Sequence, residues 1–560
     1  MSGEDEVFEF FAKHLEGWEI YPQPQINGKK PDIAVFNPNV GLGIFEVKDW
    51  DLASNDWPKY RDAIKQAQSY RNIFRSLFFA RHNQSMEIPV TVGLIFTRAS
   101  TADVRRHFSE FLDGTPYATI SGKEALAEGD LAQIFPLAVK PSSTRPTDDA
   151  ANDLRNWLVE PFHEWEQRQP LDEDPQQKQF VLNPGKIKRR RMKGSAGSGK
   201  SVTLVRRAAK VAAEGKDVLF VYYNNSLVNY LRDICNRTGD AHSSQIEWRT
   251  FHSYCRLLFM QLGCLEKFDE LAQDSGNWDT AIPAYLSKRM EDRISSVKKF
   301  HAIYVDEGQD FNLTWWNLLR RCVREDGEMM IAFDTAQQIY PGTDWNTETL
   351  PGAGFTGRWI ELDGSRRLPS RLLPVLRSFA EQFHPIALAS LPTETTAPDT
   401  RCELRWVQVK PASRIETCVA ELIRMIQRDP LPITRAVTDL TLLCDRREDC
   451  LRAEGILSKN GINVTSVANV DVTKERIAKK NFTMRTPRVK ICTFKSYKGW
   501  QSRLIVLSVS ALTSNYAAPS LYTALTRVKK HIHGSSLTVV CSAPRLQQFG
   551  ATISDFEDRT

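Results

Sequence analysis

The sequence predicts an α/β protein in which a small mixed N-terminal domain precedes two doubly wound parallel sheets. Three observations favour this fold class. Short apolar runs alternate with helical patterns from Leu171 onward, which is typical of parallel sheets covered by helices. A glycine-rich sequence, GSAGSGKS, occupies Gly194–Ser201. A stretch rich in Pro, Ser, Thr and Asp follows residue 140 and has the composition of a linker. We therefore expect domains at 1–140, 171–355 and 356–560, with a linker and connecting helix at 141–170.

Composition is that of a globular protein of 560 residues, with 41% hydrophobic residues, a mean hydropathy of −0.39 and a net charge of +6. No apolar run reaches the ~18 residues of a membrane helix, and the acidic start does not resemble a secretory signal. The ten cysteines all follow Asp233 and form no C-x-x-C pair, which favours reduced thiols over a zinc or iron–sulfur site. These features indicate a cytoplasmic protein without a membrane partner. The charge permits a nucleic-acid partner without requiring one.

The glycine-rich sequence fits the phosphate-loop pattern G-x-x-x-x-G-K-[ST]. Its backbone amides and Lys200 are suited to phosphates, and Ser201 to Mg²⁺. The eight residues expected around the phosphates are Gly194, Ser195, Ala196, Gly197, Ser198, Gly199, Lys200 and Ser201.

Two carboxylates are expected at the end of a later strand. The apolar run Ile303–Val305 delivers Asp306 to hold Mg²⁺ and Glu307 to orient or deprotonate water. The sequence thus predicts a nucleoside triphosphate and Mg²⁺ as cofactors. The basic run Lys186–Lys193 before the loop is either a phosphate-attracting edge or a solvated edge strand.

Further segments resemble the ordered motifs of UvrD/Rep-type superfamily 1 helicases. Asp306–Asp310 (DEGQD), Asp334–Tyr340 (DTAQQIY), Thr493–Gln501 (TFKSYKGWQ) and Leu521–Lys529 (LYTALTRVK) look like motifs II, III, V and VI. The resemblance implies two RecA-like motor domains, ATP as the nucleotide, DNA as the substrate and 3′→5′ movement. By motif position it also implies roles for single residues. Gln177, beside Gln176, would sense adenine; Gln337 would couple the γ-phosphate to the strand; Arg367 and Arg527 would reach the γ-phosphate.

Two positions depart from the family pattern. Arg366 stands where a tyrosine usually stacks on adenine, and Gln501 stands where a glutamate usually contacts the ribose. The first change is expected to weaken selectivity for adenine, and both changes are expected to weaken discrimination between nucleotides without abolishing hydrolysis.

The same resemblance implies a surface for single-stranded nucleic acid, because aromatic faces beside polar groups suit binding without sequence preference. For each aromatic residue the alternative is core packing, and Trp315 and Trp316 are expected to pack behind the catalytic strand. The polar segment Val470–Pro487 is expected to form a surface loop. The residues expected on the nucleic-acid surface are Asn224, Thr250, Phe251, His252, Tyr340 and Thr493.

The N-terminal region carries a second constellation. Glu46 and Lys48 share one face of a predicted strand, and Asp32 precedes the neighbouring strand. Two carboxylates holding Mg²⁺ beside a lysine suit phosphodiester hydrolysis. The spacing resembles the PD-(D/E)xK nuclease pattern and the nuclease-related (NERD) domain, which implies a restriction-endonuclease-like fold. Gln66 and Tyr70 resemble the supporting Q-x-x-x-Y element. Glu6 or Glu9 is expected to add a ligand.

Together these features predict an ATP- and Mg²⁺-dependent nuclease–helicase or translocase acting on DNA, with a role in bacterial DNA repair or defence against phage. Two alternatives remain open. In the first, the N-terminal domain is a DNA-binding module that does not cleave DNA. In the second, the ATPase is a nucleotide sensor that switches the nuclease. The sequence leaves the oligomeric state and any partner subunit undetermined.

Overall fold

The computed structural model describes the chain except residues 1, 25–30, 53–56, 75–88, 115–116, 142–147, 149–150, 152–153, 156–157, 159–168, 170, 172–174, 183–187, 275, 277, 340–352, 356, 393–400, 428–438, 461, 463, 485, 487 and 532–533. It is an α/β protein with three sheets, two of them wholly parallel. The chain divides into two compact units. One contains 1–164 with 485–487, and the other contains 165–484 with 488–560. None of the described helices is long and apolar enough to cross a bilayer.

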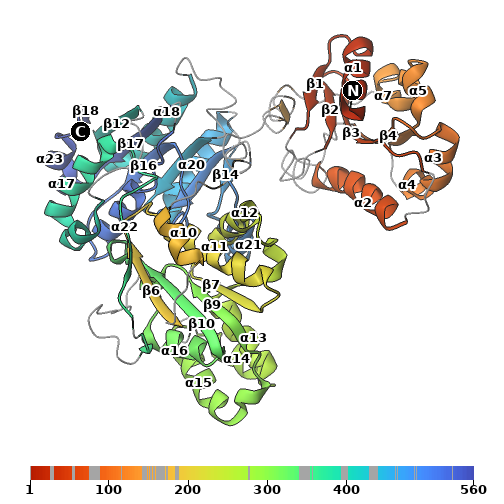
Figure 1. The fold of residues 1–560 in the computed structure, drawn as a ribbon. Helices are drawn as coiled ribbons and strands as arrows, with labels where there is room; N and C mark the ends of the chain where they lie inside the picture. The colour runs from red at the N-terminus through yellow and green to blue at the C-terminus, as the bar shows by residue number, and fades with distance from the viewer. Residues whose placement is uncertain are drawn as a thin grey trace. The chain divides into compact units, whose positions relative to one another are not determined.

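The first unit is a five-stranded mixed sheet in the order β1-β2-β3-β4-β5. β1–β3 are antiparallel, and β3–β5 are parallel. Alternate strand residues enter two cores: Ala34 and Ile44 face α2, whereas Val35 and Phe45 face α1. Figure 1 shows α1 and α2 on opposite sides of this sheet. The elements are α1 (Gly3–His14), β1 (Glu19–Pro22), β2 (Ile33–Asn37), β3 (Gly41–Lys48), α2 (Trp57–Ile73), β4 (Val90–Phe96), α3 (Thr101–His107), α4 (Ser109–Gly114), β5 (Ala118–Ser121), α5 (Lys123–Ala127), α6 (Leu131–Ile134) and α7 (Pro136–Val139).

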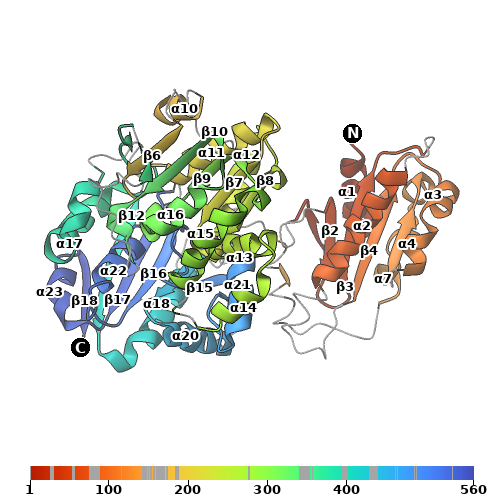
Figure 2. The ribbon, with the colours of Figure 1, turned by 90° about the horizontal axis from the view of Figure 1, so that it is seen from below.

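The second unit holds two lobes, each built on a parallel sheet. The sheet of the first lobe has six strands in the order β11-β6-β10-β9-β7-β8, most of which Figure 2 shows side by side. Its two faces form separate cores, one with α11 and α12 and the other with α13, α15 and α16. The elements are α10 (Pro175–Leu182), β6 (Arg189–Gly194), α11 (Lys200–Ala213), β7 (Val218–Tyr222), α12 (Val228–Thr238), β8 (Ile246–Thr250), α13 (Phe251–Gln261), α14 (Leu265–Leu271), α15 (Ala281–Arg293), β9 (Phe300–Val305), α16 (Leu313–Arg320), β10 (Val323–Phe333) and β11 (Ile360–Leu362).

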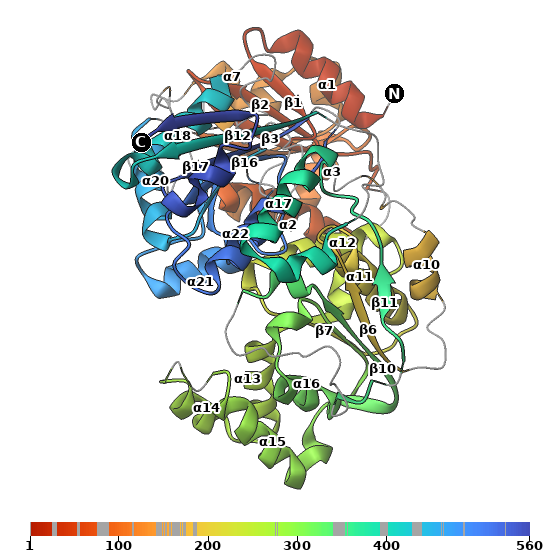
Figure 3. The same ribbon diagram turned by 90° about the vertical axis from the view of Figure 1, so that its left-hand side faces the viewer.

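The second lobe is a seven-stranded sheet in the order β14-β15-β13-β16-β17-β12-β18. Helices again cover both faces: α18 and α20 pack on one core, and α17 and α22 on the other. Figure 3 shows α17 and α22 beside each other, away from α14 and α15 of the first lobe. The elements are α17 (Leu373–Phe383), β12 (Cys402–Val409), α18 (Arg414–Gln427), β13 (Leu440–Cys444), α20 (Arg447–Lys459), β14 (Val464–Ser466), α21 (Val472–Asn481), β15 (Val489–Thr493), β16 (Leu504–Val509), α22 (Ala517–Leu525), β17 (Ser535–Cys541), α23 (Gln547–Gly550) and β18 (Asp555–Arg559).

Three sequence-based expectations about local structure are wrong. The run Trp359–Leu362 lies in the range 356–560, expected to form the second motor domain, but it contains β11, which pairs with β6 in the first lobe. The basic strand β6 is not an edge strand, because β10 and β11 flank it. The segment Val470–Pro487 contains the helix α21, whose N-terminus is capped by the Asp471 carboxylate.

Candidate functional site

The GSAGSGKS segment forms a loop between β6 and α11. Gly197 and Gly199 have φ of +81° and +94°, in the left-handed region that favours glycine. A Cβ on Gly197 would lie 2.6 Å from Ser365 Oγ and 2.7 Å from Arg367 Cβ, so the next segment packs directly on the loop. The N-terminus of α11 begins at Lys200, which places free backbone amides at the loop.

A cavity of about 420 Å³ opens beside this loop, between the two lobes. The first lobe lines it with loop residues and the ends of β9 and β10, and the second lobe with residues 499–501 and 527–530. Every predicted γ-phosphate residue reaches this cavity. The predicted residues on its wall are Gln177, Gly197, Gly199, Lys200, Ser201, Glu307, Gln337, Arg366, Arg367, Gln501 and Arg527, and Asp334 also lines it.

The chain that leaves β11 is fastened to the phosphate loop. Ser195 Oγ donates to Gly364 O at 2.8 Å, and Ser365 Oγ donates to Ala196 O at 2.8 Å. The Arg366 amide donates to Gly197 O at 3.0 Å. These bonds hold residues 364–367 against the loop where the chain enters the second lobe.

Two arginines reach the cavity from residues 366–367 and from the end of α22. Arg367 is half-buried and lines the cavity, but its Nε and Nη2 are enclosed and have no hydrogen-bond partner among the described residues. Burial, and secondarily the charge of Arg527, lowers the pKa of Arg367 to about 9. Arg527 donates through Nη2 to the side-chain oxygen of Gln337. Enclosed guanidinium nitrogens without a partner are costly, so this arrangement favours an anion in the cavity.

Asp306 and Glu307 follow β9 at the floor of the cavity. Burial, together with the charge of Glu307, raises the pKa of Asp306 to about 7, while the Ser201 hydroxyl opposes that rise. One oxygen of Asp306, Oδ2, is buried and has no hydrogen-bond partner among the described residues. A free carboxylate oxygen beside a hydroxyl fits a hard cation such as Mg²⁺.

Glu307 differs from its neighbour in backbone and charge. Its φ of +56° lies in the left-handed region, which is sparsely populated by residues other than glycine and is a form of strain found at functional sites. Burial raises its pKa, but the charges of Lys498, Arg527 and Lys200 outweigh burial and lower it overall. Glu307 is therefore held as a carboxylate.

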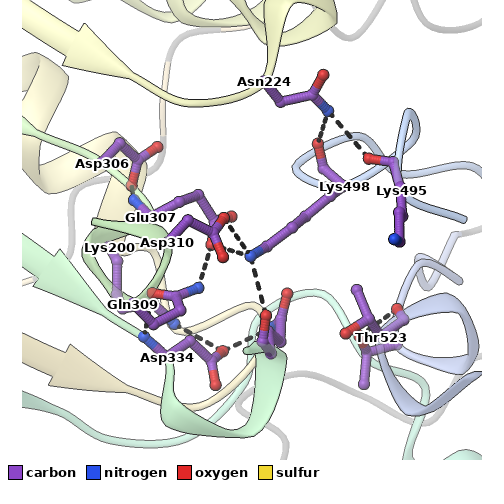
Figure 4. Close-up of polar contacts among 12 residues, drawn as sticks. Lys200, Asn224, Asp306, Glu307, Gln309, Asp310, Asp334, Lys495, Lys498 and Thr523 are labelled. Carbon is purple, nitrogen blue, oxygen red and sulfur yellow. Dashed lines mark hydrogen bonds and ion pairs between the residues drawn. The ribbon is translucent and has the colours of Figure 1, made fainter. Parts of the chain in front are cut away.

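A chain of polar contacts joins the phosphate-loop lysine to Arg527. Lys200 Nζ lies 3.1 Å from Asp334 Oδ2 (Figure 4). The same Asp334 oxygen also accepts from Gln337 Nε2 at 2.7 Å. The other side-chain atom of Gln337 accepts from Arg527. Gln337 thus links a first-lobe ion pair to a second-lobe arginine.

The other wall of the cavity carries the residues predicted at the base and ribose. Gln177 Nε2 and Arg366 Nη1 both donate to Ser198 O, at 3.2 and 3.1 Å. Gln501 lines the same cavity. The structure places all three residues at this cavity, where Arg366 contributes a guanidinium.

The segment Lys495–Gln501 of the second lobe docks on the first lobe. Asn224 Nδ2 donates to the backbone oxygen of Lys498 at 3.0 Å (Figure 4). It also donates to the backbone oxygen of Ser496 at 3.0 Å. Lys498 Nζ donates to Asp310 Oδ2 at 2.7 Å and to Gln337 O at 2.9 Å. The Asn224 amide, predicted to contact nucleic acid, is therefore used in a contact between lobes.

The remaining nucleic-acid candidates have mixed positions. The prediction that Phe251 stacks on a base is wrong: the side chain is fully buried, and its ring stacks on Trp315 at 4.2 Å. Trp315 and Trp316 are buried, as expected. Thr250 caps α13, His252 lies 3.1 Å from Asp279 Oδ1, and Thr493 Oγ1 lies 2.9 Å from Ser496 Oγ. Tyr340 lies outside the described residues.

In the first unit, Asp32, Glu46 and Lys48 converge at the ends of β2 and β3. The antiparallel pairing of Ile33 with Phe45 continues to place Asp32 opposite Glu46. Lys48 Nζ lies 2.6 Å from Glu46 Oε2 and 3.8 Å from Asp32 Oδ2. Burial, with the charge of Glu46, raises the pKa of Asp32 to about 6.

The supporting residues also meet this cluster. Gln66 Nε2 and Tyr70 Oη both donate to Glu46 Oε1, at 2.9 and 2.5 Å. Glu46 is almost fully buried, so α2 fixes its carboxylate in one orientation. The Lys48 ammonium thus lies between the Glu46 and Asp32 carboxylates.

The acidic residue of α1 that lies near this cluster is not one of the two that were expected. Glu6 and Glu9 are exposed on α1, whereas Glu4 lies near enough to raise the pKa of Asp32. No three His, Cys, Asp or Glu side chains among the described residues are grouped as a metal site. A metal at this centre would use Asp32 and Glu46, and Lys48 would have to withdraw from Glu46.

The sequence assigned no role to Asp310, Asp334, Lys498 or Ser365, although the first three lie inside quoted motifs and Ser365 directly precedes Arg366. The position of a residue in a motif could have indicated that it has a role. It could not have shown which of these residues contact each other across the two lobes. A comparison with models of protein families gives no match, and a search of curated proteins also gives none. The resemblance to helicases and nucleases therefore rests on the motifs quoted above.

Proposed function

We propose that this chain is an ATP- and Mg²⁺-dependent nuclease–translocase that acts on DNA. The observation that carries the proposal is the cavity where Lys200, Arg367 and Arg527 converge, because two enclosed nitrogens of the Arg367 guanidinium have no partner among the described residues and favour an anion. Convergence of two lobes on one triphosphate is the arrangement by which hydrolysis drives movement on a strand. By motif resemblance the nucleotide is ATP, and the two lobes are RecA-like.

In this proposal Lys200 binds the β- and γ-phosphates, and Glu307 orients the attacking water and accepts its proton. Arg367 and Arg527 stabilise the charge that develops on the γ-phosphate. Bound Mg²⁺, at Asp306 and Ser201 or at Asp32 and Glu46, supplies positive charge to phosphoryl oxygens and lowers the pKa of a coordinated water.

The nuclease part rests on the cluster in the first unit. Gln66 and Tyr70 fix Glu46, and Lys48 lies within reach of both carboxylates. Lys48 is placed to stabilise charge on a phosphodiester once it releases Glu46. A cytoplasmic role in DNA repair or in defence against phage follows from joining a nuclease and a motor in one chain.

The test measures ATP turnover with single-stranded DNA, duplex DNA and RNA while the integrity of each substrate is followed. Lys200→Ala and Glu307→Gln should abolish strand-stimulated turnover, whereas Lys216→Ala, an exposed lysine in the same lobe, should not. Lys48→Ala should abolish cleavage without changing ATP turnover, with exposed Lys13→Ala as its control.

The outcomes also separate the alternatives. Turnover stimulated by a strand without metal-dependent cleavage favours a translocase with a non-cleaving N-terminal domain. Cleavage that needs ATP but survives Glu307→Gln favours a nucleotide-sensing switch. If Lys48→Ala cuts as well as the parent protein, the proposed nuclease centre is wrong.

A further inference from the structure

A lysine of the second lobe lies buried among the carboxylates that follow β9 in the first lobe. Lys498 is 2% exposed. Its ammonium donates to Asp310 Oδ2 at 2.7 Å and to Gln337 O at 2.9 Å, and it lies 3.5 Å from Glu307 Oε2 (Figure 4). One cation from the far lobe is thus shared by three groups of the near lobe.

The loop that carries this lysine is fastened on both sides of it. Asn224 and Ser226 of the first lobe donate to Ser496 O, at 3.0 and 2.7 Å. After the lysine, Trp500 Nε1 donates to Ser226 O at 3.0 Å. All three bonds join the two lobes. Lys498 can therefore occupy this position only while the lobes are in contact.

Glu307 depends on contacts of this kind. Its backbone is in the left-handed region, and among the described residues its carboxylate contacts Gln309 Nε2 at 2.5 Å and Lys498 Nζ at 3.5 Å. Gln309 belongs to the same short turn as Glu307. Lys498 is therefore the contact that ties the Glu307 carboxylate to the other lobe.

We propose, resting on the ATP hydrolysis proposed above, that Lys498 is a positioning residue through which the second lobe holds Glu307 in place to act on water. When the lobes separate, the ammonium leaves and Glu307 loses its alignment. ATP is then hydrolysed only while both lobes enclose it. Lys498 touches neither nucleotide nor water in this scheme.

A purely structural role is the competing explanation, because Lys498 also neutralises Asp310. A pair of substitutions separates the two roles. Lys498→Met leaves Asp310 buried without its cation, so both folding stability and turnover should fall. Lys498→Met combined with Asp310→Leu removes the whole pair, so stability should return. Turnover should stay low in the double variant, because Glu307 still lacks its partner.

The expected numbers are a fall in kcat of at least thirtyfold for Lys498→Met and for the double variant, with nucleotide Kd within about threefold of the parent protein. In a Glu307→Gln background, adding Lys498→Met should change the residual single-turnover rate less than threefold. Lys495→Met, an exposed lysine of the same loop, is the matched control and should leave kcat unchanged.

The inference is overturned if the double variant recovers the kcat of the parent protein together with its stability. It is also overturned if Lys498→Met costs the Glu307→Gln protein the same factor as it costs the parent. A parent protein that hydrolyses no ATP refutes the proposed function and this inference with it. A parent protein that hydrolyses ATP beside an equally active Lys498→Met variant refutes the inference alone.

Discussion

Replacing Arg367 by methionine should stabilise the protein without nucleotide and weaken its response to nucleotide. The pKa of Arg367 falls well below that of a free guanidinium, to about 9, chiefly because of burial. At about 1.4 kcal/mol for each pH unit, that fall corresponds to a few kcal/mol against the charged form. Because the folded-state pKa is the lower one, this penalty is complete below about pH 9 and disappears as the pH rises toward the pKa of a free guanidinium.

At pH 7 the free energy of unfolding of the Arg367→Met variant should therefore be about 1–4 kcal/mol higher than that of the parent protein. This is the gain typical of replacing buried ions by apolar side chains. The same variant should lose about 10³-fold or more in kcat, as expected when an arginine that contacts a γ-phosphate is removed. Denaturant-induced unfolding, with and without a non-hydrolysable ATP analogue and Mg²⁺, measures the first effect. Steady-state ATP turnover measures the second.

Arg377→Met is the matched control, because Arg377 is exposed on α17 and should change the unfolding free energy by less than about 0.5 kcal/mol. The reasoning fails if Arg367→Met lowers the unfolding free energy without nucleotide. It also fails if the analogue stabilises the variant as much as the parent, because the guanidinium then makes no contact with the triphosphate.

Three other predictions concern packing, charge and the phosphate loop. Phe251→Ala should lower the free energy of unfolding by about 3–5 kcal/mol because the ring packs on Trp315. The affinity of the folded variant for single-stranded DNA should not change. A loss of this affinity in the folded variant would support base stacking by Phe251. Burial lowers the pKa of Lys490 to about 7. The free energy of unfolding should therefore rise from pH 7 toward pH 10 by up to about 1.4 kcal/mol per pH unit. This rise should be absent in Lys490→Met, and an unchanged slope in that variant would mean that Lys490 does not cause it. Gly197→Ala should weaken nucleotide binding in calorimetry, because its Cβ would lie 2.6 Å from Ser365 Oγ at a φ of +81°; unchanged affinity would mean that the loop adapts.

The short-range parts of the site could be predicted from the sequence. The phosphate loop, Asp306 and Glu307 each lie within a few residues of the strand or helix that positions them, so local pattern is enough. Glu46, Gln66 and Tyr70 could be grouped for a similar reason, since strand and helix periodicity set the face of each side chain.

The contacts between lobes could not be predicted in the same way. Lys498 and Asp310 are 188 residues apart, and nothing in either segment specifies the other. Phe251 was misassigned because an aromatic ring beside polar residues has the same local pattern whether it packs inside or faces a strand. Only its stacking on Trp315 separates the two cases.

The basic strand β6 illustrates a related difficulty. Its arginines suggested an exposed edge, but the strand lies inside the sheet. Arg191 lies 4.5 Å from the centroid of the Trp359 ring, and on the neighbouring helix Arg207 pairs with Glu328 at 2.8 Å. These partners come from distant segments, so composition alone could not show how the charges are accommodated.

The reciprocal serine bonds between the phosphate loop and residues 364–367 have a mechanical consequence. Ser195 Oγ donates to Gly364 O, and Ser365 Oγ donates to Ala196 O. Because the two hydrogen bonds run in opposite directions, they resist sliding of the two segments as well as their separation. A small displacement of the phosphate loop therefore also moves residues 364–367, which lead into the second lobe.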